Sequence, residues 1–310
     1  MTRIRRRAVT AVVAMLLMSS CVSIGGPGSV PTQQRDDSVI TVASFDFPES
    51  ELLAELYATL LARKGYPVRR LTNLGSREIV QPALLQDRVD LVPEYVGTAL
   101  GFVTLGQTLV TSDSSEMRAQ LALALRPHDV AVMALTHAQD RNGFVVTRST
   151  ARRYGLKKVS DLRPVSDRLS FGGPPECTER PLCLGGLQTR YGVSFKRFVP
   201  LDAGGPTTVA AIVEGTVDVA LLFTTDPNIA LHHLVLLKDD KHLQPAENVV
   251  PVIRGHIVRQ FGGGIRKALN ELSARLTTRG LRSLNRKTQI LGRAPHEVAR
   301  RWLTEQGLLG

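Results

Sequence analysis

Few residues of this 310-residue chain have types and spacings that suit catalysis. Glu176 and Glu247 are candidates for a general acid and base, as paired carboxylates are in glycosidases, but nothing in their spacing supports that role. His232–His233 is the one adjacent histidine pair and is more typical of surface histidines than of a metal site. The run Gly262–Gly264 lacks the lysine of a phosphate-binding P-loop. With no nucleophile-elbow, zinc-protease or dinucleotide motif either, the sequence predicts no enzyme, metal or cofactor.

The composition is that of an ordinary globular protein. Hydrophobic residues make up 43% and charged residues 22%, which excludes disordered and collagen-like chains, and the length favours two domains. The net charge of +11 is concentrated in a cluster of arginines near the N-terminus and in the region from Arg259 onward. No aromatic residues interleave with the basic residues of that second region, so we expect a solvated helix face and no nucleic-acid partner.

The N-terminus has the layout of an export signal. Positive charge at 3–7 precedes an apolar run from Ala8 to Met18, then Ser19, Ser20 and Cys21. These last residues resemble a bacterial lipobox, with Met18 at the position usually held by Leu. The resemblance implies a signal peptide over 1–20, lipid on Cys21 and a flexible linker over 21–38, which would tether the protein to the outer face of the cytoplasmic membrane. Plain secretion with an unmodified Cys21 thiol is the alternative, and the Sec and twin-arginine routes both stay open.

Two further cysteines fit an exported protein. Cys177 and Cys183 are six residues apart, and an even pair in an oxidising compartment favours a short-loop disulfide. Two free thiols are the alternative. Zinc is not expected, because no histidine or second cysteine pair lies near enough to complete a ligand set.

A diverged internal repeat organises the rest of the chain. Segment 83–98 resembles segment 211–226, with alanine, valine, aspartate and an aromatic at matching positions. Around each copy, short apolar runs typical of strands alternate with helical patterns, which predicts an α/β fold with parallel sheets in two lobes. Ligand loops are then expected at the carboxyl ends of the strands. The expected strands are 40–44, 68–71, 89–92, 169–171, 195–200 and 217–223, and helices are expected from Pro48 to Gly65, from Ser76, over 204–214, and in a C-terminal set over 265–277, 281–288 and 295–306.

One segment carries a family resemblance. Residues 90–100, Asp-Leu-Val-Pro-Glu-Tyr-Val-Gly-Thr-Ala-Leu, resemble the D-x-x-x-E-Y-x-G-T-A-L signature of the substrate-binding proteins of osmoprotectant ABC importers, the receptors for glycine betaine, carnitine and choline. Weaker similarities extend over nearly all of the mature chain. The resemblance implies a type II periplasmic-binding-protein fold: two lobes, a ligand cleft between them and a two-strand hinge. Lobe 1 would be 39–142 plus 249–310, and lobe 2 would be 143–248.

The resemblance also implies roles for individual residues. In this family the cationic group of the solute lies in an aromatic cage, through cation–π attraction, and its carboxylate is clamped by an arginine and polar groups. Tyr95 matches a cage tyrosine, Thr98 a hydroxyl donor and Arg180 the clamping arginine. Phe223 stands where the family usually has a cage tyrosine, and it is followed by the family's Thr225-Asp226.

The chain departs from the family pattern at several positions. Phe45 stands after Ser44, where the family often has lysine. No aromatic remains near Asn142, and Glu247 replaces another. The pocket would then combine few rings with Glu247 and Asp140, and take a cation by charge pairing. The alternatives are core positions for Tyr95 and Phe223, a surface ion pair for Arg180 and an exposed Glu247.

The expected function is capture by lobe closure and delivery to a membrane permease powered by an ATPase. The solute would be a small quaternary ammonium compound of the glycine betaine or choline kind, and the protein a monomer. Two alternatives are a receptor for another solute on the same fold and a lipoprotein that binds only protein partners.

Overall fold

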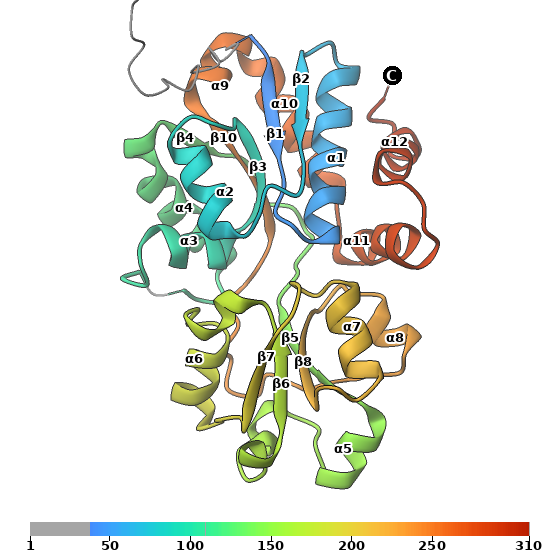
Figure 1. The fold of residues 1–310 in the computed structure, drawn as a ribbon. Coiled ribbons are helices and arrows are strands. Elements are labelled where there is room, and N and C mark those ends of the chain that lie inside the picture. Colours follow the sequence, from blue (N-terminus) through green and yellow to red (C-terminus); the bar gives the residue numbers. More distant parts are fainter. Residues whose placement is uncertain (1–37, 109, 310) are drawn as a thin grey trace, which may run out of the picture. The chain divides into compact units, whose positions relative to one another are not determined.

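The computed structural model describes residues 38–108 and 110–309, which form two five-stranded sheets covered by helices (Figure 1). The predicted signal peptide, Cys21 and the predicted linker up to residue 37 lie outside the described residues. Within the part that is described, we find no helix of the length and apolar character needed to cross a bilayer.

The first sheet has the strand order β2-β1-β3-β10-β4. Strands β1, β2 and β3 are parallel, whereas β10 is antiparallel to both of its neighbours. The prediction of parallel strands is thus confirmed for β1, β2 and β3, but it is wrong for β10, and the sheet is mixed. The physical reason is that β10 enters the sheet from an extended connection rather than through a crossover helix. The strands are β1 (Ile40–Ala43), β2 (Val68–Leu71), β3 (Leu91–Tyr95), β4 (Val130–Val132) and β10 (Val249–Arg254).

Helices bury apolar side chains on both faces of this sheet. One face packs against α1, α10 and α12 through residues such as Leu56, Leu272 and Trp302, and the other packs against α2, α3 and α4. The C-terminal helices therefore lie against α1, as the positions of their apolar residues lead one to expect (Figure 1). The helices are α1 (Pro48–Arg63), α2 (Arg77–Leu85), α3 (Val96–Val103), α4 (Ser114–Leu125), α9 (Gly255–Phe261), α10 (Gly263–Arg275), α11 (Thr278–Asn285) and α12 (Pro295–Glu305).

The second sheet repeats this plan with the order β7-β6-β8-β5-β9. Strand β5 is antiparallel to β8, while β6 is parallel to β7 and β8. The elements are β5 (Asn142–Val146), α5 (Arg148–Tyr154), β6 (Ser170–Gly173), α6 (Leu184–Gly186), β7 (Arg197–Pro200), α7 (Pro206–Val213), β8 (Val219–Phe223), α8 (Asn228–Leu231) and β9 (Val235–Leu236).

The chain passes between the two sheets twice, through 133–141 and 237–248. These segments run side by side: Gln139 and Asn248 form an antiparallel bridge, and the Asp140 N–H donates to the Glu247 carbonyl at 3.0 Å. Two connections of this kind are what the expected hinge requires. They also bring the backbones of Asp140 and Glu247 together, although these residues are 107 positions apart in the sequence.

The internal repeat corresponds to a shared structural device. Asp90 Oδ2 accepts from the Thr41 backbone N–H at 2.7 Å, and Asp218 Oδ2 accepts from the Ser170 N–H at 2.8 Å. In each half, an aspartate before the third strand thus holds the first strand. The strand predicted at 89–92 begins instead at Leu91, because Asp90 serves as this tie, and it runs on to Tyr95.

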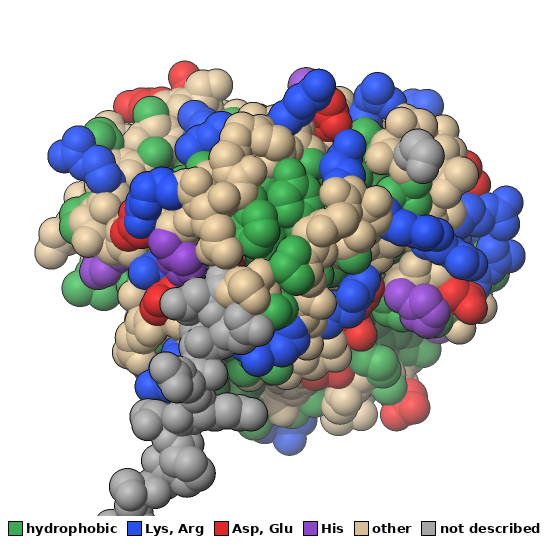
Figure 2. Space-filling model, turned by 90° about the horizontal axis from the view of Figure 1, so that it is seen from above, with side chains coloured by type: hydrophobic (Ala, Val, Ile, Leu, Met, Phe, Trp, Pro, Cys, Tyr) green, Lys and Arg blue, Asp and Glu red, His purple; other side chains and the backbone are tan. Residues whose placement is uncertain are grey.

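Basic residues of the C-terminal region lie on exposed helix faces, as predicted. Figure 2 shows Lys and Arg side chains distributed around one face rather than gathered in a single patch. Those that are exposed in this region include Arg259, Arg266, Lys267, Arg275, Arg279, Arg282, Arg286, Arg293, Arg300 and Arg301.

Candidate functional site

Four aromatic rings meet where strands of both sheets end. Phe47, in the loop after β1, lies at the centre of the group. Its ring centroid is 4.9 Å from that of Phe223, 6.1 Å from that of Tyr95 and 5.9 Å from that of Phe45. Phe223 ends β8 of the second sheet, so rings from both sheets are in contact. This brings together three predicted residues, Phe45, Tyr95 and Phe223.

Phe47 was not among the residues predicted for the site. A signal for it exists in the sequence, since Phe47 comes just after the strand expected at 40–44, and ligand loops are expected at the carboxyl ends of the strands. Aligning the chain with the family motif draws attention to Phe45, which follows Ser44. Only the packing shows that the ring two residues later reaches Phe223.

The Phe45 ring already has a cation over it. The Arg77 guanidinium carbon lies 4.8 Å from the ring centroid, and Arg77 also forms a buried ion pair with Glu94 at 2.7 Å. Phe45 is only 2% exposed. Its ring is therefore less available to a solute than those of Phe47 and Phe223, which are partly exposed.

A buried carboxylate lies behind the Tyr95 ring. Glu49, in the first turn of α1, accepts a hydrogen bond from the Tyr95 hydroxyl at 2.7 Å. It also accepts from the Thr225 hydroxyl and from the Asn285 side-chain amide. Burial raises the pKa of Glu49, and these three donors oppose the shift. The predicted residue Thr225 is thus joined to Tyr95 through a glutamate that the motif comparison did not single out.

Asp140, which the sequence did single out, faces Glu49. Asp140 Oδ1 accepts from the Thr225 N–H at 2.9 Å and from the Thr224 hydroxyl at 3.0 Å. Asp140 Oδ2 is buried and has no hydrogen-bond partner among the described residues. Burial and the charge of Glu49 raise the pKa of Asp140 well above its ordinary value. The two carboxyls lie within hydrogen-bonding reach of each other, which favours a state in which they share one proton.

Glu247 occupies the N-terminus of α3. Glu247 Oε2 accepts from the backbone N–H groups of Gly97 at 3.0 Å and Thr98 at 3.1 Å, and Oε1 accepts from the Thr98 hydroxyl. The approach requires glycine at 97, because a Cβ there would lie 2.6 Å from Pro245 and 2.7 Å from the Ala246 carbonyl. Burial raises the pKa of Glu247 to about 7, against the effect of these donors. The Glu247 side chain is only 2% exposed. The alternative prediction, in which Glu247 is exposed, is wrong.

Arg180 is bound to another part of the chain. Its guanidinium pairs with Glu78 of α2 through bonds of 2.8 and 3.1 Å. Burial raises the pKa of Glu78, but its bonds with Arg180 and Ser76 outweigh that effect and lower the pKa to about 2. This ion pair joins a loop of the second sheet to a helix of the first, as the surface ion-pair alternative for Arg180 describes.

Two further predicted residues, Ser44 and Asn142, form hydrogen bonds with backbone groups. The Ser44 hydroxyl donates to the Phe45 carbonyl at 2.9 Å and accepts from the Asn73 N–H at 2.7 Å. Asn142 donates to the Leu182 carbonyl at 3.2 Å and pairs with Phe223 in the sheet. These bonds fix the loops that carry the rings.

The Cys177–Cys183 disulfide is present, with the two Cα atoms 5.2 Å apart, which confirms the predicted pairing. It closes the loop that carries Arg180.

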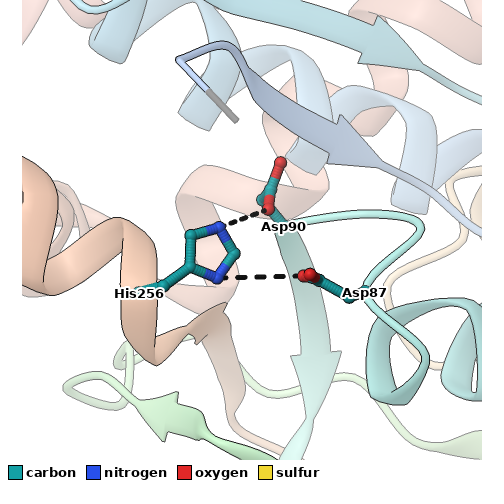
Figure 3. A group of neighbouring side chains, drawn as sticks. All are labelled: Asp87, Asp90 and His256. Atoms are coloured by element: carbon teal, nitrogen blue, oxygen red, sulfur yellow. Dashed lines mark ion pairs between the residues drawn. The ribbon is translucent and has the colours of Figure 1, made fainter. Parts of the chain in front are cut away.

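A second cluster of titratable groups lies elsewhere. His256 stands between Asp87 and Asp90, with nitrogen–oxygen distances of 3.8 and 3.7 Å (Figure 3). The atom types would suit a metal ion. However, Arg254 Nε lies 3.0 Å from Asp87 Oδ1, and Asp90 holds Thr41. Through these contacts the cluster connects the loop between α2 and β3 to β10 and α9.

A groove of about 610 Å³ lies outside the aromatic group. It is lined by Pro48 and Glu51 of α1, by α7 and the glycines before it, by residues 228 and 232 at α8 and by residues 288–295, and it includes none of the predicted binding residues. The aromatic group itself is closely packed around buried carboxylates, so size alone does not locate the site.

Comparison with known proteins gives one family. Residues 38–305 match the model described as the substrate binding domain of ABC-type glycine betaine transport systems. The carnitine transport binding protein OpuCC of Listeria monocytogenes is 26% identical over 300 residues, which cover 96% of this chain and 94% of that protein. The ergothioneine transport permease/ergothioneine binding protein EgtU of Helicobacter pylori is 24% identical, over 98% of this chain but only 54% of its own length.

The fold also matches solved structures. A crystal structure described as a glycine betaine/carnitine/choline ABC transporter superposes with a TM-score of 0.68 at 24% identity, over 87% of this chain and 100% of that one. At that identity the match shows the fold, which is the two-lobed type II periplasmic-binding-protein fold.

Proposed function

Because the chain belongs to the family of substrate-binding domains of ABC-type glycine betaine transport systems, and is thus the extracytoplasmic solute-binding component of such an importer, we propose that it captures a small quaternary-ammonium osmoprotectant. It does so by lobe closure and delivers the solute to a membrane permease. Its role is binding, not catalysis.

The meeting of Phe47, Tyr95 and Phe223 carries this proposal. Ring faces attract alkylammonium groups, and the attraction grows when the site is dry. The contact of Phe47 with Phe223 joins the two sheets, so a cation held there would touch both. Glu49, hydrogen-bonded to the Tyr95 hydroxyl, adds a buried negative charge beside the rings.

Two side-chain contacts between the sheets are of the kind that would hold the lobes closed. The Thr225 hydroxyl bonds to Glu49, and Arg180 pairs with Glu78, each across the two sheets. The two connections at 133–141 and 237–248 supply the hinge. We propose lobe 1 as 39–142 plus 249–310 and lobe 2 as 143–248.

The cellular context follows from the same proposal. Lipid on Cys21 would anchor the protein to the outer face of the cytoplasmic membrane, with 21–38 as a spacer. The partners are the permease and ATPase subunits of the importer, and the protein acts as a monomer. The Cys177–Cys183 disulfide is consistent with an oxidising compartment.

The test is thermal unfolding of the chain from Ser38 against glycine betaine, choline, carnitine, amino acids, polyamines and sugars. A ligand at 100 times its Kd stabilises the folded state by roughly 2.7 kcal/mol. We expect a shift with a quaternary ammonium compound that Tyr95→Ala abolishes. A shift only with another class would leave a receptor for a different solute. No shift with any solute would favour a lipoprotein with protein partners.

A further inference from the structure

Places near the aromatic group that could bind an anion are already filled by the chain's own carboxylates. The N–H groups at the start of α3 are the first, and Glu247 accepts from Gly97 and Thr98 there. A helix N-terminus is a natural site for an anion, and here its occupant is a residue of the protein.

The two nearby guanidinium groups are also engaged. Arg77 is bound to Glu94 at 2.7 Å, and Arg180 is bound to Glu78 at 2.8 Å. A solute carboxylate would have to compete for these side chains. Displacing Glu94 would leave a buried carboxylate without its partner, which is costly, whereas the partly exposed pair of Arg180 with Glu78 is the weaker barrier.

The buried charges of this region are mostly negative. Glu49, Glu94, Asp140 and Glu247 are each at most 3% exposed, and among the described residues Arg77 is the one basic side chain that is buried. Arg77 pairs with Glu94 and its charge also acts on Glu247, so Glu49 and Asp140 are the two carboxyls of this region with no basic side chain beside them among the described residues. A positively charged solute would balance this buried negative charge.

One carboxylate oxygen beside the rings has no side-chain or backbone donor in the described part of the chain. Asp140 Oδ2 is buried without a partner among the described residues, next to Glu49. In the empty protein a proton shared with Glu49 satisfies this oxygen, but a cation beside the pair favours release of that proton, and the buried oxygen then calls for a donor on the solute. A quaternary ammonium group has no donor, so the donor must be elsewhere on the solute.

Building on the function proposed above, we infer that the solute is a cation that carries a hydroxyl or N–H donor and no carboxylate, and that Glu247 is the residue that excludes carboxylate-bearing solutes. The cationic group lies against Phe47, Tyr95 and Phe223 and the Glu49–Asp140 pair, and the donor satisfies Asp140 Oδ2. Choline has both features, whereas glycine betaine has the same cationic group with a carboxylate and no donor.

The experiment is isothermal titration of the chain from Ser38 with choline, tetramethylammonium and glycine betaine. These share a quaternary ammonium group and differ in the donor and the carboxylate. We expect choline to bind at least 10-fold more tightly than glycine betaine, with tetramethylammonium between them. If glycine betaine binds as tightly as choline, the inference is wrong while the proposed function stands. If no member of the panel binds, both are wrong.

A variant tests the role of Glu247 directly. Glu247→Gln keeps an oxygen to accept from Gly97 and Thr98 but removes the negative charge. We expect the preference for choline over glycine betaine to shrink at least 3-fold, and the exposed substitution Glu297→Gln on α12 to leave it unchanged. An unaltered preference would show that Glu247 serves only to hold α3. Should Glu247→Gln fail to fold, the three wild-type affinities still decide the inference.

Discussion

Two carboxylate regions border the same aromatic group and differ in how their oxygens are satisfied. Glu247 has three donors, all from the first turn of α3, and is held by one local structure. Glu49 and Asp140 are held by donors from several distant segments, and one oxygen of Asp140 remains without a partner among the described residues. The difference indicates that the first region is complete within the protein, whereas the second relies on a proton shared by two carboxyls, which a cationic ligand could replace.

The largest expected effect is the loss of folding stability when the Glu49 carboxylate is removed. Glu49→Ala leaves the Tyr95 and Thr225 hydroxyls and the Asn285 amide without their acceptor, and we expect the free energy of unfolding to fall by about 3–5 kcal/mol. Glu51→Ala, two residues along α1 and only partly buried, should change it by less than about 0.5 kcal/mol. Denaturant unfolding measures both. Similar losses in the two variants would mean that Glu49 has no special structural role.

The pH dependence of stability comes next. The folded-state pKa of Glu247 is about 7, above its ordinary value of 4.5, so the folded chain binds this proton more tightly than the unfolded chain. The resulting stability is complete below pH 4.5 and is lost as the pH rises toward 7, by roughly 3 kcal/mol. The raised pKa values of Glu49 and Asp140 act in the same direction.

Unfolding measured between pH 4 and 8 tests this, with Glu247→Gln as the comparison. The variant should have a flatter profile, since one titrating group is gone. A profile as steep as that of the wild type would assign the dependence to the Glu49–Asp140 pair, which Tyr95 and Asp226 also face.

The unpartnered oxygen permits a more specific test. Asp140→Asn keeps an acceptor for the Thr225 N–H and removes the repulsion from Glu49, so the empty protein should be as stable as the wild type or more stable. Binding of choline should weaken about 10-fold, because the charged acceptor is lost. Calorimetric titration and unfolding of the same sample give both values. Unchanged affinity would show that Asp140 has no contact with the solute.

The smallest effect is expected at Arg180. As a surface ion pair with Glu78, it should contribute about 1 kcal/mol or less, and less at high salt. Arg180→Gln and Glu78→Gln should then alter unfolding and solute affinity by similar amounts. If instead Arg180→Gln weakens glycine betaine alone, Arg180 clamps the solute carboxylate, as the family motif implies.

The repeat halves were predictable because local chemistry determines them. Apolar runs and helix-start residues located β1, α1, β2 and α7 within a few residues, and the repeated Asp90 and Asp218 indicated equivalent strands. α3 and α4 were not predicted, and neither was the antiparallel pairing of β10. Strand direction in a sheet depends on where the chain re-enters it, which a local pattern does not encode.

The sequence by itself determined the class of the protein and predicted a short list of candidate binding residues. The motif over 90–100 identified the family, and the pair Cys177 and Cys183 indicated the disulfide, because each signal lies within a few residues of chain. Only the tertiary structure decided which charges meet. Glu49, Asp140 and Thr225 are far apart in the sequence, and they come together because two sheets are connected twice by extended segments. That packing determines the partner of each buried charge. The binding of the Glu247 carboxylate to the start of α3, and the lack of a donor for Asp140 Oδ2 among the described residues, can therefore be found only in the folded chain.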